Sequence, residues 1–198
     1  MPTHDIDVWF RATDALDEAA IAAAASVLSD EERARYRGFQ FAHDARDYAA
    51  AHALLRHTLS LRGDQAPAEW RFEKTPAGKP RLISERAERQ SFSLSHTGGM
   101  VACAVTSGAE IGVDVEWIDR EVDAGRIAAR FFAPAEAGLL LELEGRARRN
   151  RFFDFWVLKE ALVKALGREM AASLSTLAFT VGAGGEIRLD VPDIDPDA

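Results

Sequence analysis

Cysteine is nearly absent from this chain of 198 residues, because Cys103 is the only one. One cysteine excludes an intramolecular disulfide, and nothing in the composition indicates an oxidising compartment. The chain has no run of about 20 apolar residues, the length that a membrane-spanning helix needs. Its first residues include acidic groups, whereas a targeting signal begins with positive charge. We therefore expect a cytoplasmic protein that does not interact with membranes.

An excess of positive charge is also missing. The chain has 24 basic and 32 acidic residues, which gives a formal net charge of −8. Proteins that bind nucleic acid in general present a basic surface, so this composition argues against binding to DNA or RNA. A local basic site for a phosphorylated ligand remains compatible with it. Hydrophobic residues make up 47% of the chain, which is enough for a sizeable core.

Helix and strand patterns follow the same order in the two halves of the chain. One long helix is predicted over residues 44–61 and ends near Gly63, and another over residues 150–166 ends at Gly167. Each is followed by a strand, a glycine-containing turn and a second strand. This order predicts an α+β protein with a structural duplication. No residue-level repeat accompanies it, and a chance recurrence of the same order is the alternative.

Two acidic residues share one side of a strand predicted over residues 110–117. Apolar residues at every second position are expected to face a core: Ile111, Val113, Val115 and Trp117. Asp114 and Glu116 then project side by side from the other face, together with Gly112. Hard oxygen ligands of this kind suit Mg²⁺. The alternative is a half-exposed strand with two solvated acids.

A second group of charged side chains lies on the long helix near the C-terminus. Trp156, Glu160 and Lys164 occupy successive i,i+4 positions and share one face. The rest of this helix is mostly apolar, which indicates burial, and buried charges are usually paired or bound to metals. The alternative is an ordinary Glu–Lys pair on the surface.

Groups suited to phosphate lie between these elements. Lys79 is part of a Gly-Lys-Pro turn, and Ser95 and His96 stand at the end of a serine-rich strand. Their side chains can donate hydrogen bonds to phosphate oxygens, although a lone histidine after a strand is more often structural. The chain has no Gly-x-Ser-x-Gly motif, and nothing marks an acid that would orient a catalytic histidine. The sequence therefore gives no indication that a serine or cysteine of the chain itself is a nucleophile.

Together these segments resemble the Sfp-type 4′-phosphopantetheinyl transferases. The resemblance lies in GKP (78–80), FSLSHTG (92–98), IGVDVE (111–116), RFFAPAE (130–136) and WVLKEALVKALG (156–167). It implies an enzyme that moves the 4′-phosphopantetheine arm of coenzyme A to a serine of an acyl or peptidyl carrier protein and releases 3′,5′-ADP. It also implies two similar α/β halves, residues 1–105 and 106–198, related by a pseudo-twofold axis with the active site in the cleft between them.

The resemblance assigns roles to the acidic residues. Asp114, Glu116 and Glu160 are expected to bind Mg²⁺, which grips the diphosphate of coenzyme A. Glu160, or a water molecule that it positions, would take the proton from the carrier serine. Lys164 would contact the diphosphate and support the departing 3′,5′-ADP. An internally duplicated monomer is expected.

The nucleotide end of coenzyme A would be held by basic and hydroxyl groups. Lys79, Ser95 and His96 are expected to bind its phosphates, and Arg46 lies where the family places a base against the 3′-phosphate. The family often has arginine at the position of Asp47, one residue away on the predicted helix. Further basic residues of this region are Arg33 and Arg35.

The carrier protein is expected to meet a basic segment of this otherwise acidic chain. The basic residues of the segment are Arg126, Arg130, Arg146, Arg148, Arg149 and Arg151, and they outnumber its glutamates. The alternative is an ordinary solvated surface. Two other functions remain open from the sequence: an inactive homologue that binds coenzyme A or a carrier protein, and a metal-dependent phosphohydrolase.

Overall fold

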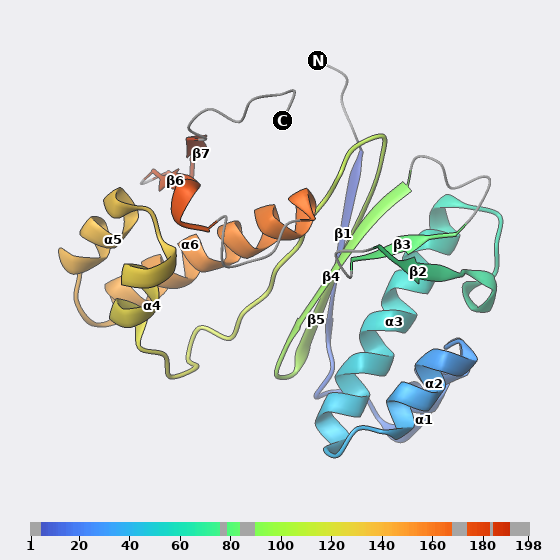
Figure 1. Ribbon diagram of the computed structural model, residues 1–198. Helices are drawn as coiled ribbons and strands as arrows, with labels where there is room; N and C mark the ends of the chain where they lie inside the picture. The colour runs from blue at the N-terminus through green and yellow to red at the C-terminus, as the bar shows by residue number, and fades with distance from the viewer. Residues whose placement is uncertain (1–4, 76–78, 84–89, 168–173, 183, 191–198) are drawn as a thin grey trace.

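The predicted mixture of helices and strands is confirmed. The structure is a computed structural model, and it describes residues 5–75, 79–83, 90–167, 174–182 and 184–190 (Figure 1). The elements form two groups, one after the other along the chain. None of the described helices is both long and apolar enough to cross a membrane.

An antiparallel sheet and one long helix form the centre of the first group. The strands lie in the order β1 (Ile6–Ala12), β5 (Met100–Ser107) and β4 (Gln90–Thr97). Helix α3 (Ala42–Arg62) packs on one face of this sheet, where Leu55 and Leu59 contact Phe92 of β4. Since side chains alternate along a strand, Ser93 and Ser95 of β4 lie on the face opposite α3. This second face is the one that carries the site.

Shorter elements complete the first group. They are helix α1 (Glu18–Ser26), helix α2 (Asp30–Arg37), the 3₁₀ turn η1 (Pro67–Glu69), and the hairpin of β2 (Phe72–Lys74) and β3 (Pro80–Leu82). Helix α2 begins with a capping box, in which Ser29 and Glu32 each bind the backbone N–H of the other. This local signal is readable from the sequence and fixes where α2 starts.

The second group repeats this order of elements. It contains α4 (Ala124–Phe131), α5 (Pro134–Leu141), α6 (Gly145–Leu166), η2 (Leu174–Thr176), β6 (Ala178–Val181) and β7 (Ile187–Asp190). Both groups thus have two short helices, one long helix, a 3₁₀ turn and a hairpin. The pseudo-twofold relation and the boundary at residue 105 stay predictions.

Helix α6 is longer than predicted and is anchored by an aromatic core. It begins five residues before the predicted start at residue 150, and it ends at Gly167, whose φ of 62° is the left-handed conformation favoured by glycine at this position. Phe132 stacks on Phe152 at 5.4 Å between ring centres and meets Phe155 edge-on at 6.1 Å. These contacts hold the N-terminal part of α6 against α4 and α5.

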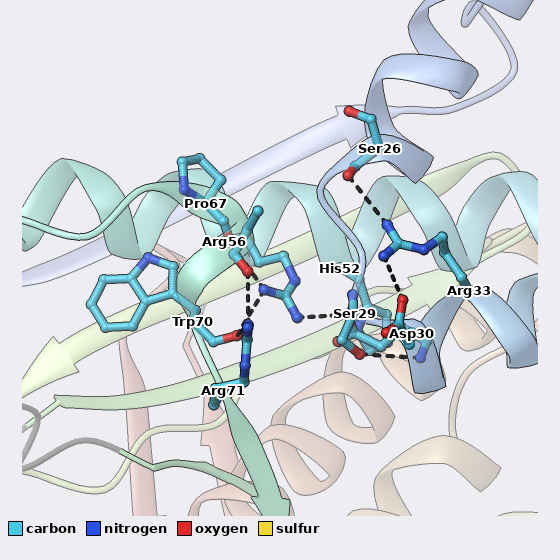
Figure 2. A network of polar contacts seen from close by, with 11 residues as sticks. Ser26, Ser29, Asp30, Arg33, His52, Arg56, Pro67, Trp70 and Arg71 are labelled. Atoms are coloured by element: carbon cyan, nitrogen blue, oxygen red, sulfur yellow. Dashed lines mark hydrogen bonds and ion pairs between the residues drawn. The ribbon is translucent and has the colours of Figure 1, made fainter.

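A buried ion pair fastens α3 to the elements around it. The Arg56 side chain is 1% exposed, and its guanidinium lies 2.6 Å from the Glu32 carboxylate. It also donates hydrogen bonds of 2.9 Å to the carbonyl oxygens of Pro67 and Trp70, as Figure 2 shows. His52 Nδ1 lies 2.8 Å from the second oxygen of Glu32. One carboxylate and one guanidinium therefore tie α2, α3 and η1 together.

The environment of Glu32 makes stability depend on pH. Burial works to raise the pKa of Glu32, but the contacts with His52, the Ser29 N–H and Arg56 lower it from 4.5 to about 2. A carboxyl whose pKa is lower in the folded state stabilises the protein above its unfolded pKa. This contribution, about 3 kcal/mol, disappears as the pH falls from about 4.5 towards 2.

We therefore predict that Glu32→Gln lowers the free energy of unfolding by roughly 3 kcal/mol at pH 7, because the buried guanidinium loses its charged partner. The difference from the unsubstituted protein should narrow as the pH falls below about 4.5. Urea unfolding between pH 7 and pH 3.5 measures both values. Glu31→Gln, at an exposed position of the same helix, is the control. A difference that stays constant with pH would contradict the assignment.

Candidate functional site

Residues 110–117 do not form the predicted strand. The segment passes between the sheet of the first group and helix α6 (Figure 1). Its backbone N–H groups at Val113 and Val115 donate to the Oγ atoms of Ser93 and Ser95, at 3.0 and 3.3 Å. These hydroxyls take the place that the carbonyl groups of a neighbouring strand have in a ladder. The backbone is therefore held beside β4 without strand pairing.

The predicted alternation along this segment is only partly correct. Ile111 is buried and Val113 and Val115 are half-buried, but Trp117 is 58% exposed, so its predicted place in the core is wrong. The acidic residues and the glycine between the apolar positions do share a side, because all three meet α6.

Gly112 allows the segment to approach the backbone of α6. A Cβ atom added to it would lie 1.7 Å from the carbonyl oxygen of Ala161 and 2.7 Å from the backbone nitrogen of Ala165. Real Cβ atoms do not come so close to backbone, and backbone cannot move aside as the end of a side chain can. A glycine in a β-like pattern often indicates such an approach. The sequence therefore contained a signal for this contact.

Asp114 is held by residues from both groups. Its Oδ1 atom accepts hydrogen bonds of 2.7 Å from Ser95 Oγ and 2.7 Å from Lys164 Nζ. Lys164 also donates to the carbonyl oxygen of Val113 at 3.1 Å. The Oδ2 atom of Asp114 is buried and has no hydrogen-bond donor among the described residues.

Glu116 and Glu160 complete a cluster of acids along α6. Glu116 accepts hydrogen bonds from Trp156 Nε1 at 3.0 Å and from Arg120 at 3.3 Å. Glu160 is 8% exposed. Its pKa is raised, first by burial and then by the negative charge of Asp114 and Glu116, while Lys164 acts in the opposite direction. Asp114 and Glu116 therefore each lie close enough to Glu160 to repel its negative charge.

The donor set fits a divalent cation, although the three carboxylates are not arranged around one point. In the part of the chain that the structure describes, no group of three or more His, Cys, Asp or Glu side chains has the spacing of a metal site. The buried Oδ2 of Asp114 is nevertheless an unused oxygen ligand. Three carboxylates beside Lys164 and Arg120 also leave an excess of negative charge, which a hard cation would offset. Magnesium binding stays a prediction.

Lys79 reaches α6 from the first group. Its Nζ atom lies 2.6 Å from Glu110 and 3.3 Å from the carbonyl oxygen of Ala165 on α6. Gly78 of the predicted phosphate-binding turn lies outside the described residues. Lys79 also lines a hollow of about 630 Å³ together with Arg81 and Glu110. None of the three clustered acids is among the described residues that line this hollow.

Ser95 and His96 do not act from one surface. They are neighbours on β4, so their side chains point to opposite faces of the sheet. Ser95 is buried beside Asp114, whereas His96 is exposed on the side of α3. Only Ser95 of this pair belongs to the acid cluster, and the expected phosphate contact of His96 stays a prediction.

Arg46 is engaged by acids of the first group. Its guanidinium pairs with Asp14 and lies 3.5 Å from Asp47. Asp47 is 4% exposed and accepts hydrogen bonds from the Thr13 hydroxyl and, at 3.4 Å, from the Gly99 N–H. The acid at the position where the family often has arginine therefore fastens the β4–β5 turn to α3.

The other two basic residues of this region also have partners. Arg33 lies 2.8 Å from Asp30 and 3.4 Å from the carbonyl oxygen of Ser26 (Figure 2). The Arg35 guanidinium lies over the ring of Tyr48, 5.5 Å from its centre.

Comparison with known proteins agrees with the resemblance seen in the motifs. The profile of the 4′-phosphopantetheinyl transferase superfamily matches residues 110–197, and that of the N-terminal region of 4′-phosphopantetheinyl transferases matches residues 16–108. A putative 4′-phosphopantetheinyl transferase of Synechocystis sp. is 31% identical over 85% of this chain and 67% of its own length. The chain belongs to the 4′-phosphopantetheinyl transferase superfamily.

Two further relatives support the Sfp-type identification. The 4′-phosphopantetheinyl transferase HetI of Nostoc sp. is 35% identical over 74% of this chain and 62% of its own length. The 4′-phosphopantetheinyl transferase Sfp of Bacillus subtilis is 28% identical over 85% of this chain and 73% of its own length. The chain thus spans between 62% and 73% of the length of these relatives.

Three contributors to the site of this phosphopantetheinyl transferase were not predicted. Gly112 sets the distance between the acidic segment and α6, and Ser93 holds the backbone of that segment. Trp156 was placed on the correct helix face, but its hydrogen bond to Glu116 was not foreseen. The alternating serines of β4 and the glycine within an apolar pattern were the available signals.

We predict that Gly112→Ala lowers the free energy of unfolding by roughly 3 kcal/mol, because the new methyl group overlaps the α6 backbone. The displacement should also reduce the transfer rate about 100-fold. Urea unfolding and turnover of the purified variant measure the two effects. Gly138→Ala on α5, where an added Cβ meets nothing within 4 Å, is the control and should not lose stability. Equal stability of the two variants would contradict the close approach.

Proposed function

We propose that this phosphopantetheinyl transferase moves the 4′-phosphopantetheine arm of coenzyme A to a serine of an apo acyl or peptidyl carrier protein. The products are the holo-carrier and 3′,5′-ADP. The observation that supports this most directly is the cluster of Asp114, Glu116 and Glu160 beside Lys164. The cluster joins the two regions that carry the most specific motifs of the family. The Ser95 hydroxyl of the cluster already binds Asp114, and we assign the attacking hydroxyl to the carrier protein.

Asp114, Glu116 and Glu160 are the residues that would hold Mg²⁺. Bound there, the ion would neutralise the charge that develops on the diphosphate as its bridging bond breaks. Ser95 orients Asp114 through one oxygen and leaves the other oxygen free as a ligand. Trp156 orients Glu116 in the same manner.

Glu160 is the proposed acceptor of the serine proton. Without a cation, its burial and its acidic neighbours raise its pKa. A Mg²⁺ ion at these carboxylates would lower it again, so the proposed role rests on the place of Glu160 beside Asp114 and Lys164. Lys164 lies beside the same acids with 31% of its side chain exposed, so it can reach a ligand without leaving Asp114. We assign it to the departing diphosphate oxygens of 3′,5′-ADP.

The coenzyme A phosphates would replace carboxylates as partners of basic residues. Lys79 now pairs with Glu110, and Arg46 with Asp14. Both carboxylates are more exposed than the bases that they bind, so each can turn away into solvent. His96 would add a hydrogen bond from the exposed face of β4, and Ser95 would add one if its hydroxyl turned from Asp114 to a phosphate. We keep these four residues as the proposed coenzyme A contacts.

A structural duplication fits this arrangement. We propose that residues 1–105 and 106–198 are two similar halves related by a pseudo-twofold axis. The repeated order of helices, 3₁₀ turn and hairpin supports the proposal. The segment that carries Asp114 would open the second half, as β1 would open the first, and the clustered acids would lie between the two.

The carrier protein is proposed to dock on the basic segment that ends with the start of α6. The surface of this segment is more basic than the composition of the segment indicates, because Glu136 is 2% exposed and does not offset the arginines there. Arg148 and Arg149 line a small hollow of about 270 Å³ together with residues of α4. Arg120 links this surface to the acid cluster through Glu116. An acidic carrier would be attracted to this surface, and salt would weaken the attraction.

Mass spectrometry of a carrier protein tests the proposed reaction. With coenzyme A, Mg²⁺ and an apo carrier, the protein should add the mass of one phosphopantetheine arm. Glu160→Gln should reduce the rate by roughly 100-fold or more, because an amide is no base and a poorer ligand. Glu142→Gln, at an exposed position, is the control. Binding of coenzyme A without a mass gain of the carrier would indicate an inactive homologue. Cleavage of coenzyme A in the absence of a carrier would indicate a phosphohydrolase.

Reversal of charge tests the docking surface. Arg148→Glu combined with Arg149→Glu should raise the KM for the carrier about tenfold at low salt, with little change in kcat, because rim charges act mainly on encounter. The same double reversal at Arg11 and Arg188, exposed residues of β1 and β7, should leave KM unchanged. Steady-state kinetics at two salt concentrations measure the effect. An unchanged KM in the first variant would reject the surface.

A further inference from the structure

A second buried ion pair fastens helix α6, and it lies next to the acid cluster in the sequence. Lys159 is fully buried, and its Nζ atom lies 2.8 Å from the carboxylate of Glu136 on α5. The same ammonium donates hydrogen bonds to the carbonyl oxygens of Leu174, at 2.6 Å, and of Leu177. All three N–H groups of the ammonium therefore have an acceptor. Lys159 thus ties α6 to α5 and to η2.

This ion pair corresponds to the pair of Arg56 and Glu32 in the first group, except that the second carboxylate oxygen meets His52 in one and the Phe179 N–H in the other. Each glutamate is the third residue of a short helix, and each accepts a hydrogen bond from the backbone N–H of the capping residue. These bonds are 2.8 Å long at Ser29 and 2.9 Å at Ala133. Each cation lies on the next long helix of the chain, α3 or α6.

The carbonyl acceptors correspond as well. Arg56 binds the oxygens of Pro67 and Trp70, the first residue of η1 and the residue after it. Lys159 binds those of Leu174 and Leu177, the first residue of η2 and the residue after it. We call these two arrangements the Arg56 clamp and the Lys159 clamp. They make the same connections with different cations.

The clamps differ in the residue that comes after the cation on its helix. Arg56 precedes His57, which is exposed. Lys159 precedes Glu160, which is 8% exposed and close enough to Asp114 for the charge of that residue to raise its pKa. Gly112 packs against the α6 backbone at Ala161, the residue after Glu160. Helix α6 is therefore held against η2 by Lys159 and against the acidic segment at Ala161.

A helix held on two sides has little freedom to rotate about its axis. Such a rotation would change the positions of the acid-cluster side chains that the helix carries. A side-chain end about 5 Å from the axis moves by roughly 2 Å when a helix turns by about 20°. A misplacement of about 1 Å near the chemistry can reduce a rate roughly 100-fold. Glu160 and Lys164 share one helix face, so both would be displaced together.

We infer that Lys159 is a positioning residue of the transfer reaction, which holds α6 in the rotation that keeps Glu160 and Lys164 beside Asp114. The inference rests on the proposed function for its catalytic consequence. It assigns the Arg56 clamp a structural role with respect to the acid cluster, because no member of that cluster lies on α3, and Arg46, the proposed coenzyme A contact on this helix, lies near its opposite end. The two clamps therefore provide a matched pair of a positioning cation and a structural one.

The test compares Lys159→Met with Arg56→Met in the full chain. Both variants should melt at lower temperature by similar amounts, because each leaves a buried glutamate without its cation. Below both melting temperatures, Lys159→Met should bind Mg²⁺ at least tenfold more weakly in calorimetric titration. Its kcat should fall at least 30-fold while its KM for the carrier changes less than threefold. Arg56→Met should keep Mg²⁺ affinity and kcat within threefold of the original values.

Two milder variants guard against loss of the fold. Lys159→Arg reproduces the cation of the first clamp and should recover most of the Mg²⁺ affinity. Glu136→Gln keeps an acceptor for the Phe179 N–H but removes the charge, so it should weaken Mg²⁺ binding if Lys159→Met does not fold. Full Mg²⁺ affinity in Lys159→Met or in Glu136→Gln would overturn the inference. Equal losses in Arg56→Met would overturn it as well.

The calorimetric readout separates this inference from the proposed function. If the unsubstituted protein binds Mg²⁺ but transfers no phosphopantetheine, the proposed function fails. The comparison of Mg²⁺ affinities between the two clamps still decides whether Lys159 positions the acid cluster.

Discussion

The contact between residues 110–117 and helix α6 is the constraint on which the site depends. A glycine at position 112 lets two backbones meet at a distance that no other residue permits. That approach brings Asp114 and Glu116, from the segment after the first sheet, to Glu160 on the helix. The hydroxyls of Ser93 and Ser95 hold the other side of the segment. The acids are thus positioned by packing on both sides, which suits a site that must keep its geometry.

The same packing concentrates negative charge where water is scarce. Burial and mutual repulsion raise the pKa of Glu160, and Lys164 offsets only part of the charge. A protein that needed only stability would be better served by uncharged side chains at these positions, since buried carboxylates without a cation cost free energy. The unsatisfied oxygen of Asp114 adds to that cost. Retention of the cluster is therefore more readily explained by a ligand of opposite charge than by folding.

How much could be predicted from the sequence depends on the range over which each signal acts. Two-residue alternation correctly placed Asp114 and Glu116 on one side, and helical spacing did so for Glu160 and Lys164. Neither signal indicates which surfaces contact each other. Only the family resemblance predicted that the acids of the segment and those of the helix belong to one site. Alternation indicates an extended backbone but not its hydrogen-bond partners, which is why the strand at 110–117 was wrong. The partners of Lys79 also depend on contacts between segments far apart in the chain.

The proposed duplication has no residue-level repeat for a related reason. The repeated feature is a set of connections, in which a cation on a long helix joins a capping glutamate to two carbonyls of a 3₁₀ turn. Arginine meets these acceptors in one half and lysine in the other, and carbonyl oxygens leave no trace in residue identity. Such a clamp requires only a cation long enough to reach its acceptors, so the side chains can differ while the connections stay the same. Of the two, the Lys159 clamp adjoins the acids on α6, so connections that only stabilise the first group of elements also bear on the proposed site in the second.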